Sequence, residues 1–315
     1  MNLISIEDNK NNIIIKHKDL VLKARYRLSE LGIKIMAVLI SMIKVSDEDF
    51  KQYALNIDDF KELIGSDSKN TYKYTHRVIQ ELLSKTLKVG DEQFSWITYG
   101  KYVEGENTVI LEVNRHLKPY LLRIQRDFIK YNIANILSLK SEYVIRLYEL
   151  FKSKFTEYKH YNPNTNSYTF ELKISWLRGH FEIPESYRYN DIKRNVIDKA
   201  RKQFLQKTDI KFTYKEQKIG RKVDRLIITI RENAQGSNSH LNSLKSFISY
   251  LRTNYVNKDI AETKDKYTEE KILLSVSETG ELYNKYTTEK FNSKRALEIW
   301  KSLYKLAKNN KLDIF

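Results

Sequence analysis

Apolar residues recur at helical spacing along most of the chain, and short runs rich in β-branched residues separate the helices. The first strong pattern follows Ser29, which can serve as an N-cap, and continues to residue 44. Because this run is apolar on most faces, we expect a helix that is buried in the core or lies at a subunit contact. The polar residues 1–19 before it contain an Ile13–Ile15 patch, which predicts an arm with one strand.

A helix-turn-helix is predicted next. Residues 56–64 read as a short helix that ends at Gly65. Residues 66–68 can each cap a second helix, which we expect to run to about Lys85. Two helices joined by so short a turn are typical of DNA-binding domains.

The second of these helices has two distinct sides. Tyr74, Val78 and Leu82 are expected to face inward at helical spacing. Polar and basic residues are expected on the other side: Lys69, Asn70, Lys73, Arg77 and Gln80. Residues 93–113 then contain two β-rich runs around a turn at Gly105. A helix pair followed by a β-hairpin is the order of a winged helix.

The same order of elements is predicted a second time. An amphipathic helix covers residues 139–156 and turns four large apolar residues inward: Val144, Leu147, Leu150 and Phe151. The elements expected after it are a strand at 168–172, a short helix at 173–179 that ends at Gly179, a longer helix from about 190 to 206, and a hairpin at 210–231 with its tip at 218–222. The chain therefore reads as two tandem units of one architecture.

We predict an α+β fold of two tandem winged-helix domains followed by a small C-terminal helical or α+β module. The expected boundaries are 1–130 for the first domain, 131–232 for the second, 233–240 for a linker of small polar residues and 241–315 for the module. Within the module the sequence predicts a helix at 241–255, a strand pair at 271–285 and a helix at 289–309.

Composition narrows the class of protein. Cysteine is absent, and no apolar run approaches the roughly eighteen residues that a membrane-spanning helix needs. The polar N-terminus has no signal-peptide core, so we expect a cytoplasmic protein with no membrane partner. Lys and Arg total 56 against 40 Asp and Glu, a net charge of +16. Such a balance favours polyanionic partners, with an acidic membrane surface or plain solubility as rival explanations.

The positive charge is concentrated in one segment. Residues 188–225 contain thirteen Lys and Arg against five Asp and Glu, which leaves +8, half the net charge of the chain. On the helix within this segment, five apolar residues form one stripe: Ile192, Val196, Ile197, Ala200 and Phe204. The residues that project away from the stripe are Arg194, Asn195, Asp198, Arg201 and Lys202. The basic face has few large apolar residues, which disfavours a membrane-surface helix.

This segment predicts a DNA interface. Arg can pair bidentately with guanine and Asn with adenine in the major groove, while other cations hold phosphates. We therefore expect DNA contacts from two sets of residues in the second unit: Arg194, Asn195, Arg201 and Lys202 on the helix, and Lys218, Arg221 and Lys222 at the tip of the hairpin. In the first unit Lys69, Lys73 and Arg77 are candidates for phosphate contacts, with a solvated surface as the competing interpretation.

Signatures of catalysis are missing. The sequence contains no phosphate-cradling Gly-x-x-x-x-Gly-Lys-Ser/Thr loop and no Gly-x-Gly-x-x-Gly. Tyr is abundant, with 22 residues, so a nickase with a Tyr nucleophile is the enzymatic alternative. No His-x-His pair is present to hold the metal that such a nickase would use. The carboxylates at 47–49 and 58–59 could hold a metal for phosphoryl transfer, but we interpret them as loop and helix-start residues. We therefore expect a protein that is not an enzyme and that uses no metal or cofactor.

Two stretches carry a family resemblance. Residues 16–43 resemble the opening of iteron-binding theta-type plasmid replication initiators. Residues 188–230 resemble the second winged helix of that family, with an Arg/Lys-rich helix, a Thr-Asp-hydrophobic-Lys step and a Gly-Arg-Lys wing. The resemblance covers residues 16–232 and leaves the C-terminal module out.

The resemblance implies that the second winged helix reads the iteron through its recognition helix and wing. It adds Lys193 to the direct contacts of the helix, and Lys215 to the cations that hold the wing against the backbone or minor groove. It also implies that monomers bind direct repeats at an origin, open it and recruit host initiator and helicase proteins. Dimers formed through the first domain would bind an inverted repeat at the promoter of the initiator's own gene. Asp191 and Asp198 would orient Arg side chains or accept from cytosine. A winged-helix transcriptional repressor without an initiator role remains the alternative.

Overall fold

The computed structural model describes most of the chain. The described residues are 4–5, 13–44, 46–64, 71–103, 105–233, 259–264, 271–277, 281–292 and single residues between 295 and 303. The chain forms two compact units, residues 1–237 and 238–315. Lys69, the linker residues 234–240 and the predicted helix at 241–255 lie outside the described residues.

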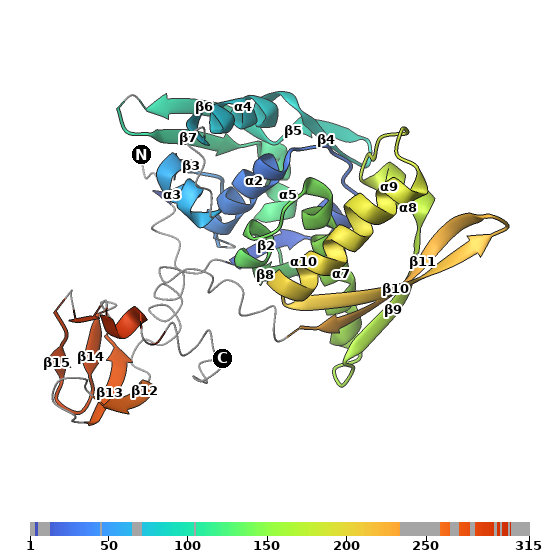
Figure 1. The fold of residues 1–315 in the computed structure, drawn as a ribbon. Coiled ribbons are helices and arrows are strands. Elements are labelled where there is room, and N and C mark those ends of the chain that lie inside the picture. The colour runs from blue at the N-terminus through green and yellow to red at the C-terminus, as the bar shows by residue number, and fades with distance from the viewer. Residues whose placement is uncertain are drawn as a thin grey trace. The chain divides into compact units, whose positions relative to one another are not determined.

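The first winged helix begins with the predicted buried helix and ends with a hairpin (Figure 1). Its principal elements are α2 (Glu30–Met42), β3 (Gln52–Asn56), α3 (Ile57–Leu63), α4 (Thr71–Ser84), β6 (Ile97–Val103) and β7 (Thr108–Val113). β3 pairs antiparallel with β7, which pairs with β6, and β1 (Ile4–Ser5) lies parallel to β3 at the edge. The predicted order of helix, helix pair and hairpin is therefore confirmed, with a strand added before the helix pair.

Shorter elements surround this core. They are β2 (Ile13–His17), α1 (Asp19–Leu22), β4 (Thr86–Val89), β5 (Glu92–Ser95), the 3-10 helix η1 (Arg115–Leu117), α5 (Lys118–Leu121), β8 (Phe128–Asn132) and α6 (Ala134–Leu137). β2 pairs antiparallel with β8, so the predicted N-terminal strand is incorporated into the fold. β4 and β5 form a separate hairpin.

Helix α2 starts and packs as its sequence predicts. The Ser29 hydroxyl accepts from the Gly32 amide at 3.1 Å, as an N-cap should, and Glu81 of α4 accepts from the Ser29 amide at 2.9 Å. Every residue from Gly32 to Met42 is buried within the single chain. The core interpretation of this helix is therefore confirmed.

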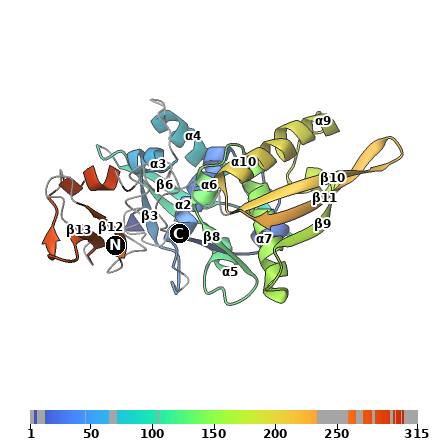
Figure 2. The same cartoon turned by 60° about the horizontal axis from the view of Figure 1, so that its bottom comes forward.

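The second winged helix repeats the order of the first. Its elements are α7 (Glu142–Tyr161), β9 (Ser167–Lys173), α8 (Ile174–His180), α9 (Tyr189–Ile192), the π-helical turn η2 (Lys193–Asp198), α10 (Lys199–Lys207), β10 (Ile210–Ile219) and β11 (Lys222–Glu232). β11 lies between β10 and β9 in an antiparallel sheet. The β10–β11 hairpin projects from the body in both views (Figures 1 and 2), and Gly220 at its tip has a φ of +60°. The α+β prediction of tandem winged helices is confirmed.

Several details differ from the sequence predictions. Tyr74 is 47% exposed, so the expectation that it faces inward is wrong; Thr75, at 0% exposure, takes the buried position one residue later. Helix α7 is shifted toward the C-terminus and extends to Tyr161 because its apolar face continues through Phe155. Asn233 is buried and donates to the Phe204, Leu205 and Thr208 carbonyls, so the ordered fold includes the first residue of the predicted linker.

The two winged helices share one hydrophobic core, and α7 runs through it. Arg146 of α7 is only 5% exposed. Its guanidinium donates to the Tyr26 carbonyl at 2.7 Å, to the Ala24 carbonyl at 3.4 Å and to the His180 carbonyl at 2.9 Å. The same group lies 4.0 Å from the centre of the Tyr26 ring and 4.6 Å from that of Phe181. Burial lowers the pKa of Arg146, and these contacts replace the hydration that it has lost.

His180 makes a second connection at this place. Its Nε2 lies 2.9 Å from the carbonyl oxygen of Val21 in α1. Its ring stacks on Trp176, with 4.4 Å between the centroids. Burial, and secondarily the charge of Arg146, lower the pKa of His180 from 6.5 to about 4. The imidazole is therefore neutral near pH 7, and a proton on Nε2 allows it to donate to Val21.

The C-terminal unit contains a four-stranded antiparallel sheet in meander order. Its strands are β12 (Asp259–Lys264), β13 (Lys271–Val276), β14 (Leu282–Asn284) and β15 (Glu289–Lys290). The predicted strand pair at 271–285 is confirmed by β13 and β14. The predicted helix at 289–309 begins too early, since 289–290 are a strand, and helical residues occur between 295 and 303. Trp300 and Leu303 of that helical stretch are 3% exposed.

We expect Arg146→Ala to lower the free energy of unfolding by about 3–5 kcal/mol, because three buried carbonyls lose their donor and a void remains between two rings. Arg27→Ala is a matched control, since Arg27 is exposed and close to the same segment. It should change the free energy by less than about 0.5 kcal/mol in the same urea titration. Equal effects of the two substitutions would contradict this role for Arg146.

The stability of the protein should also fall at low pH because of His180. In the unfolded chain this imidazole takes up a proton near pH 6.5, whereas in the fold it does so only near pH 4. The unfolded state therefore binds more protons between these values, and the free energy of unfolding drops by about 3 kcal/mol as the pH falls through that window. Urea titrations from pH 8 to pH 4 should give a shallower dependence for His180→Gln. The same slope in both proteins would disprove this assignment.

Candidate nucleic-acid interface

The elements α9, η2 and α10 form one continuous helical rod, residues 189–207, which we call the α9–α10 rod. It begins with a backbone capping contact, in which the Arg188 amide donates to the Asp191 carboxylate at 3.0 Å. The predicted apolar stripe is confirmed, since its five residues are all 0% exposed: Ile192, Val196, Ile197, Ala200 and Phe204. Because this stripe fastens the rod to the core, the opposite side is left for solvent or a ligand.

The outward side carries the predicted basic and amide residues. Arg194 has a side chain 75% exposed, and its guanidinium donates to Asp191 at 3.1 Å and to the Asn195 amide oxygen at 3.3 Å. A guanidinium has five N–H donors, so three remain for a ligand. Asp191 thus orients Arg194, one of the two roles expected of that carboxylate.

Asp198 orients Arg201 on the next turn of the rod, as Asp191 orients Arg194. Its carboxylate lies 3.4 Å from the Arg201 guanidinium and accepts from the Tyr214 hydroxyl of β10 at 2.8 Å. Burial and this hydrogen bond raise the pKa of Tyr214 to about 12. Arg201 lies 5.6 Å from the centre of the Tyr214 ring. Lys202, the other basic residue predicted here, is exposed and has no ion-pair partner among the described residues.

Lys193 is directed differently from its neighbours on the rod. Its ammonium donates to Glu216 of β10 at 2.7 Å. The hydrogen bond raises the pKa of Lys193 and lowers that of Glu216, since each charge stabilises the other. Lys193 therefore fastens the rod to the hairpin in this structure.

The hairpin brings the other predicted cations of this unit together at its far end. All four are exposed and lack an ion-pair partner within the described residues: Lys215, Lys218, Arg221 and Lys222. The pairing of Lys218 with Val223 and of Ile219 with Lys222 closes the tip at Gly220 and Arg221. Unpaired cations at the end of a projecting hairpin are free to contact phosphates.

The C-terminal end of the rod is fixed to the segment that joins the two winged helices. Gln203 exchanges two hydrogen bonds with the backbone of Lys140, at 2.7 and 2.9 Å. Lys207 donates to the Ser138 carbonyl at 3.0 Å. Glu30 of α2 accepts from the Ser141 amide at 2.8 Å, so the same segment is also held by the first winged helix.

The first winged helix has a weaker cationic surface. Lys73 and Arg77 are exposed on α4, at positions one turn apart. Lys69, the third predicted cation of this surface, lies outside the described residues. His76 of the same helix stacks on Tyr102 of β6, with 5.0 Å between the centroids.

Sequence reasoning missed two features of the hairpin. Tyr214 and Glu216 alternate with basic residues along β10, and this spacing of two was the available signal for residues that face the rod. Their partners, Asp198 and Lys193, come from a helix and could not be assigned by periodicity. Lys211 and Arg231, which are cross-strand partners in β10 and β11, were also left out of the predicted site.

Two features are absent from the described part of the chain. It contains no group of three or more His, Asp or Glu arranged to hold a metal ion. Within the same residues, no helix combines the length and the apolar character that crossing a membrane requires.

Relatives of the chain are consistent with this architecture. A replication initiation protein from Escherichia coli is 22% identical over 236 residues, which cover 71% of either chain. The crystal structure of the Pi initiator protein in complex with iteron DNA matches with a TM-score of 0.57 at 19% identity. That match covers 72% of this chain and 99% of the Pi chain.

Two family models match consecutive parts of the chain. The model described as "Initiator Replication protein, WH1" matches residues 13–152, and "Initiator Rep protein, WH2" matches residues 173–230. Together they cover more than half of the 315 residues. The chain belongs to the initiator replication protein family and carries both of its winged-helix domains.

Proposed function

We propose that this chain is a plasmid replication initiator that binds double-stranded DNA at direct repeats, or iterons, and opens the adjacent origin. The observation that supports this most is the α9–α10 rod. It buries its apolar stripe completely, holds Arg194 and Asn195 outward and lies beside a hairpin with four unpaired cations. A helix enters the major groove with its outward residues on base edges, and a wing follows the backbone or minor groove.

Base contacts and phosphate contacts are made by different residues. Arg194 and Asn195 are suited to guanine and adenine, while Arg201, Lys202 and, after release from Glu216, Lys193 bind nearby phosphates. The hairpin cations at 215–222 bind the backbone beside them. Lys73 and Arg77, with Lys69, add phosphate contacts from the first winged helix.

The proposal extends to the roles of the two domains, the partners and the cellular compartment. Residues 1–130 form the dimerisation domain and residues 131–232 the main reading domain. A monomer–dimer equilibrium separates origin binding from repression at an inverted repeat in the chain's own promoter. Host initiator and helicase proteins are the partners at the opened origin, and the protein acts in the cytoplasm without a cofactor.

The test is binding to a duplex that carries direct repeats from upstream of the gene, over a salt series. Arg194→Ala should cost about 1–3 kcal/mol on the repeat and less on random DNA, since it removes a base contact. Lys218→Ala should weaken both duplexes alike and reduce the salt slope by about 1, since it removes a phosphate contact.

Lys130→Ala serves as the control for the loss of one charge. Lys130 is exposed on β8, outside the rod and the hairpin, and has no ion-pair partner among the described residues. Equal affinity of the wild type for repeat and random DNA would refute the proposal. A repressor without an initiator role would bind the promoter but fail to support replication of a linked origin.

A further inference from the structure

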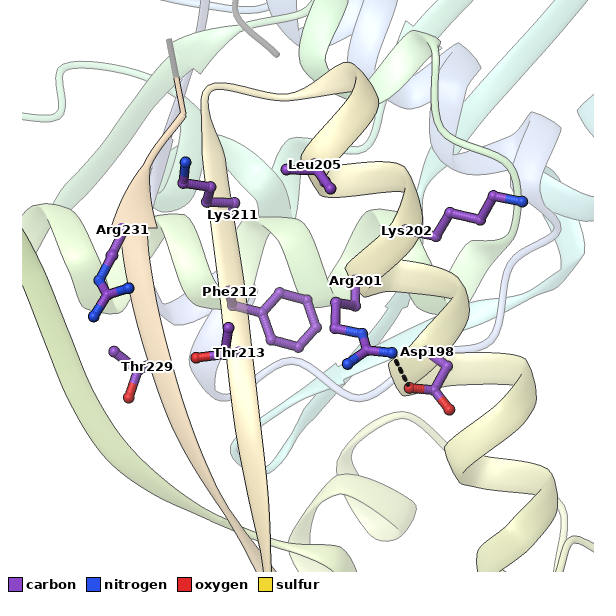
Figure 3. A pocket seen from close by; sticks show the side chains of 9 residues that line it. All are labelled: Asp198, Arg201, Lys202, Leu205, Lys211, Phe212, Thr213, Thr229 and Arg231. Carbon is purple, nitrogen blue, oxygen red and sulfur yellow. Dashed lines mark ion pairs between the residues drawn. The ribbon is translucent and has the colours of Figure 1, made fainter. Parts of the chain in front are cut away.

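A groove lies between α10 and strand β10, on the side of the rod next to the hairpin (Figure 3). Its volume is about 690 Å³. Arg201 and Leu205 line it from the helix. Lys211 and Thr213 line it from the face of β10 opposite to Phe212, because alternate residues of a strand share a face, and Arg231 is the cross-strand partner of Lys211 on that face. The ring of Phe212 extends from β10 toward the helix and forms the floor. We call this feature the α10–β10 groove.

The charge of the groove is strongly positive. Lys211 and Arg231 have no ion-pair or hydrogen-bond partner for their side chains among the described residues. Asp198 is the acidic residue of the lining, and Arg201 and the Tyr214 hydroxyl already engage it. By contrast, other cations of this unit are neutralised, as Lys152 is by Asp209 at 2.6 Å and Arg225 by Glu171 at 2.5 Å. Lys211 and Arg231 are therefore available to a polyanion.

The lining also has an apolar part. Leu205 is a large apolar residue that remains 49% exposed, and it lines the groove together with the buried Phe212. Thr213 is exposed on β10 and lies on the same face of the strand as Lys211, where its hydroxyl can accept or donate a hydrogen bond. A nucleic-acid backbone alternates anionic phosphates with less polar sugars, which matches cations and a hydroxyl around an apolar floor. An acidic peptide is the competing occupant, because β10 is an edge strand of its sheet.

The position of the groove favours DNA. A helix in the major groove, which is about 12 Å wide, is flanked on both sides by phosphodiester backbones. The α10–β10 groove lies along one flank of the same rod whose outward residues face the bases in the proposed function. One backbone must then pass over or through it.

We propose that the α10–β10 groove binds the DNA backbone of the strand next to the hairpin, with Lys211 and Arg231 on successive phosphates and Leu205 against the intervening deoxyribose. This inference rests on the proposed function and adds a phosphate site that neither the rod nor the wing tip contains. Asp198 acts as a positioning residue, because it holds Arg201 at the rim of the groove.

The experiment compares the wild type with the double variant Lys211→Ala/Arg231→Ala on repeat and random duplexes over a salt series. Loss of two phosphate contacts should reduce the salt slope by about 1.8 and weaken binding about 10- to 30-fold at 0.15 M salt on both duplexes. Lys130→Ala is again the one-charge control, and thermal unfolding by circular dichroism reports whether the variants are folded. Thr213→Glu, an exposed substitution beside the cations, should weaken binding even where the double variant is poorly folded.

Neutral methylphosphonate linkages identify the contacted phosphates from the DNA side. At two neighbouring positions of the repeat, a neutral linkage should weaken binding by the wild type. The same linkages should not weaken binding by the double variant, because that variant has already lost its contacts with those two phosphates. If the folded double variant and Thr213→Glu both keep the salt slope and the affinity of the wild type, the groove does not bind the DNA backbone. Repeat-specific binding by the wild type would then still support the proposed function. Absence of specific binding by the wild type would instead remove the proposed function.

Discussion

The guanidinium of Arg146 lies where the two winged helices meet, and the relative placement of the two depends on it. It satisfies two carbonyls of the segment before α2 and one at the end of α8, and two aromatic rings enclose it. A charge taken so far from water is tolerated only when its donors are used, so each neighbouring backbone segment must keep its position. His180, which contacts Val21 from the same place, adds a neutral hydrogen bond to this contact.

This constraint extends to the DNA-reading rod. Glu30 of α2 and Gln203 of α10 both hydrogen-bond to the same connecting segment, so the first winged helix helps to position the C-terminal end of the rod. The buried stripe fixes the rotation of the rod, and Asp191 and Asp198 fix the Arg side chains on its exposed side. An interface prepared in this way loses less side-chain entropy when it binds, which is a general route to affinity.

Much of the fold could be predicted because its signals are local. The Ser29 cap, the stripe from Ile192 to Phe204 and the turn at Gly220 each depend on a few neighbouring residues, and each prediction is confirmed. The prediction that Tyr74 of α4 faces inward was wrong, because it preferred a large aromatic residue for the buried position. The smaller Thr75 occupies that position in the packed core. The strand register of the C-terminal meander and the length of α7 depend on contacts distant in sequence, and only their approximate places could be expected.

The sequence by itself determined which residues are cationic, that half of the net charge falls within 188–225, and that this segment forms a helix and a hairpin. These properties follow from composition and periodicity, which need no knowledge of distant contacts. Tertiary structure decided which of the cations are free. Lys193 meets Glu216 and Arg225 meets Glu171 across elements that are far apart along the chain. Lys211 and Arg231 instead pair across adjacent strands, and neither forms an ion pair with another described residue. Coulomb interactions depend on distance in space, so the sequence alone could not assign these pairs.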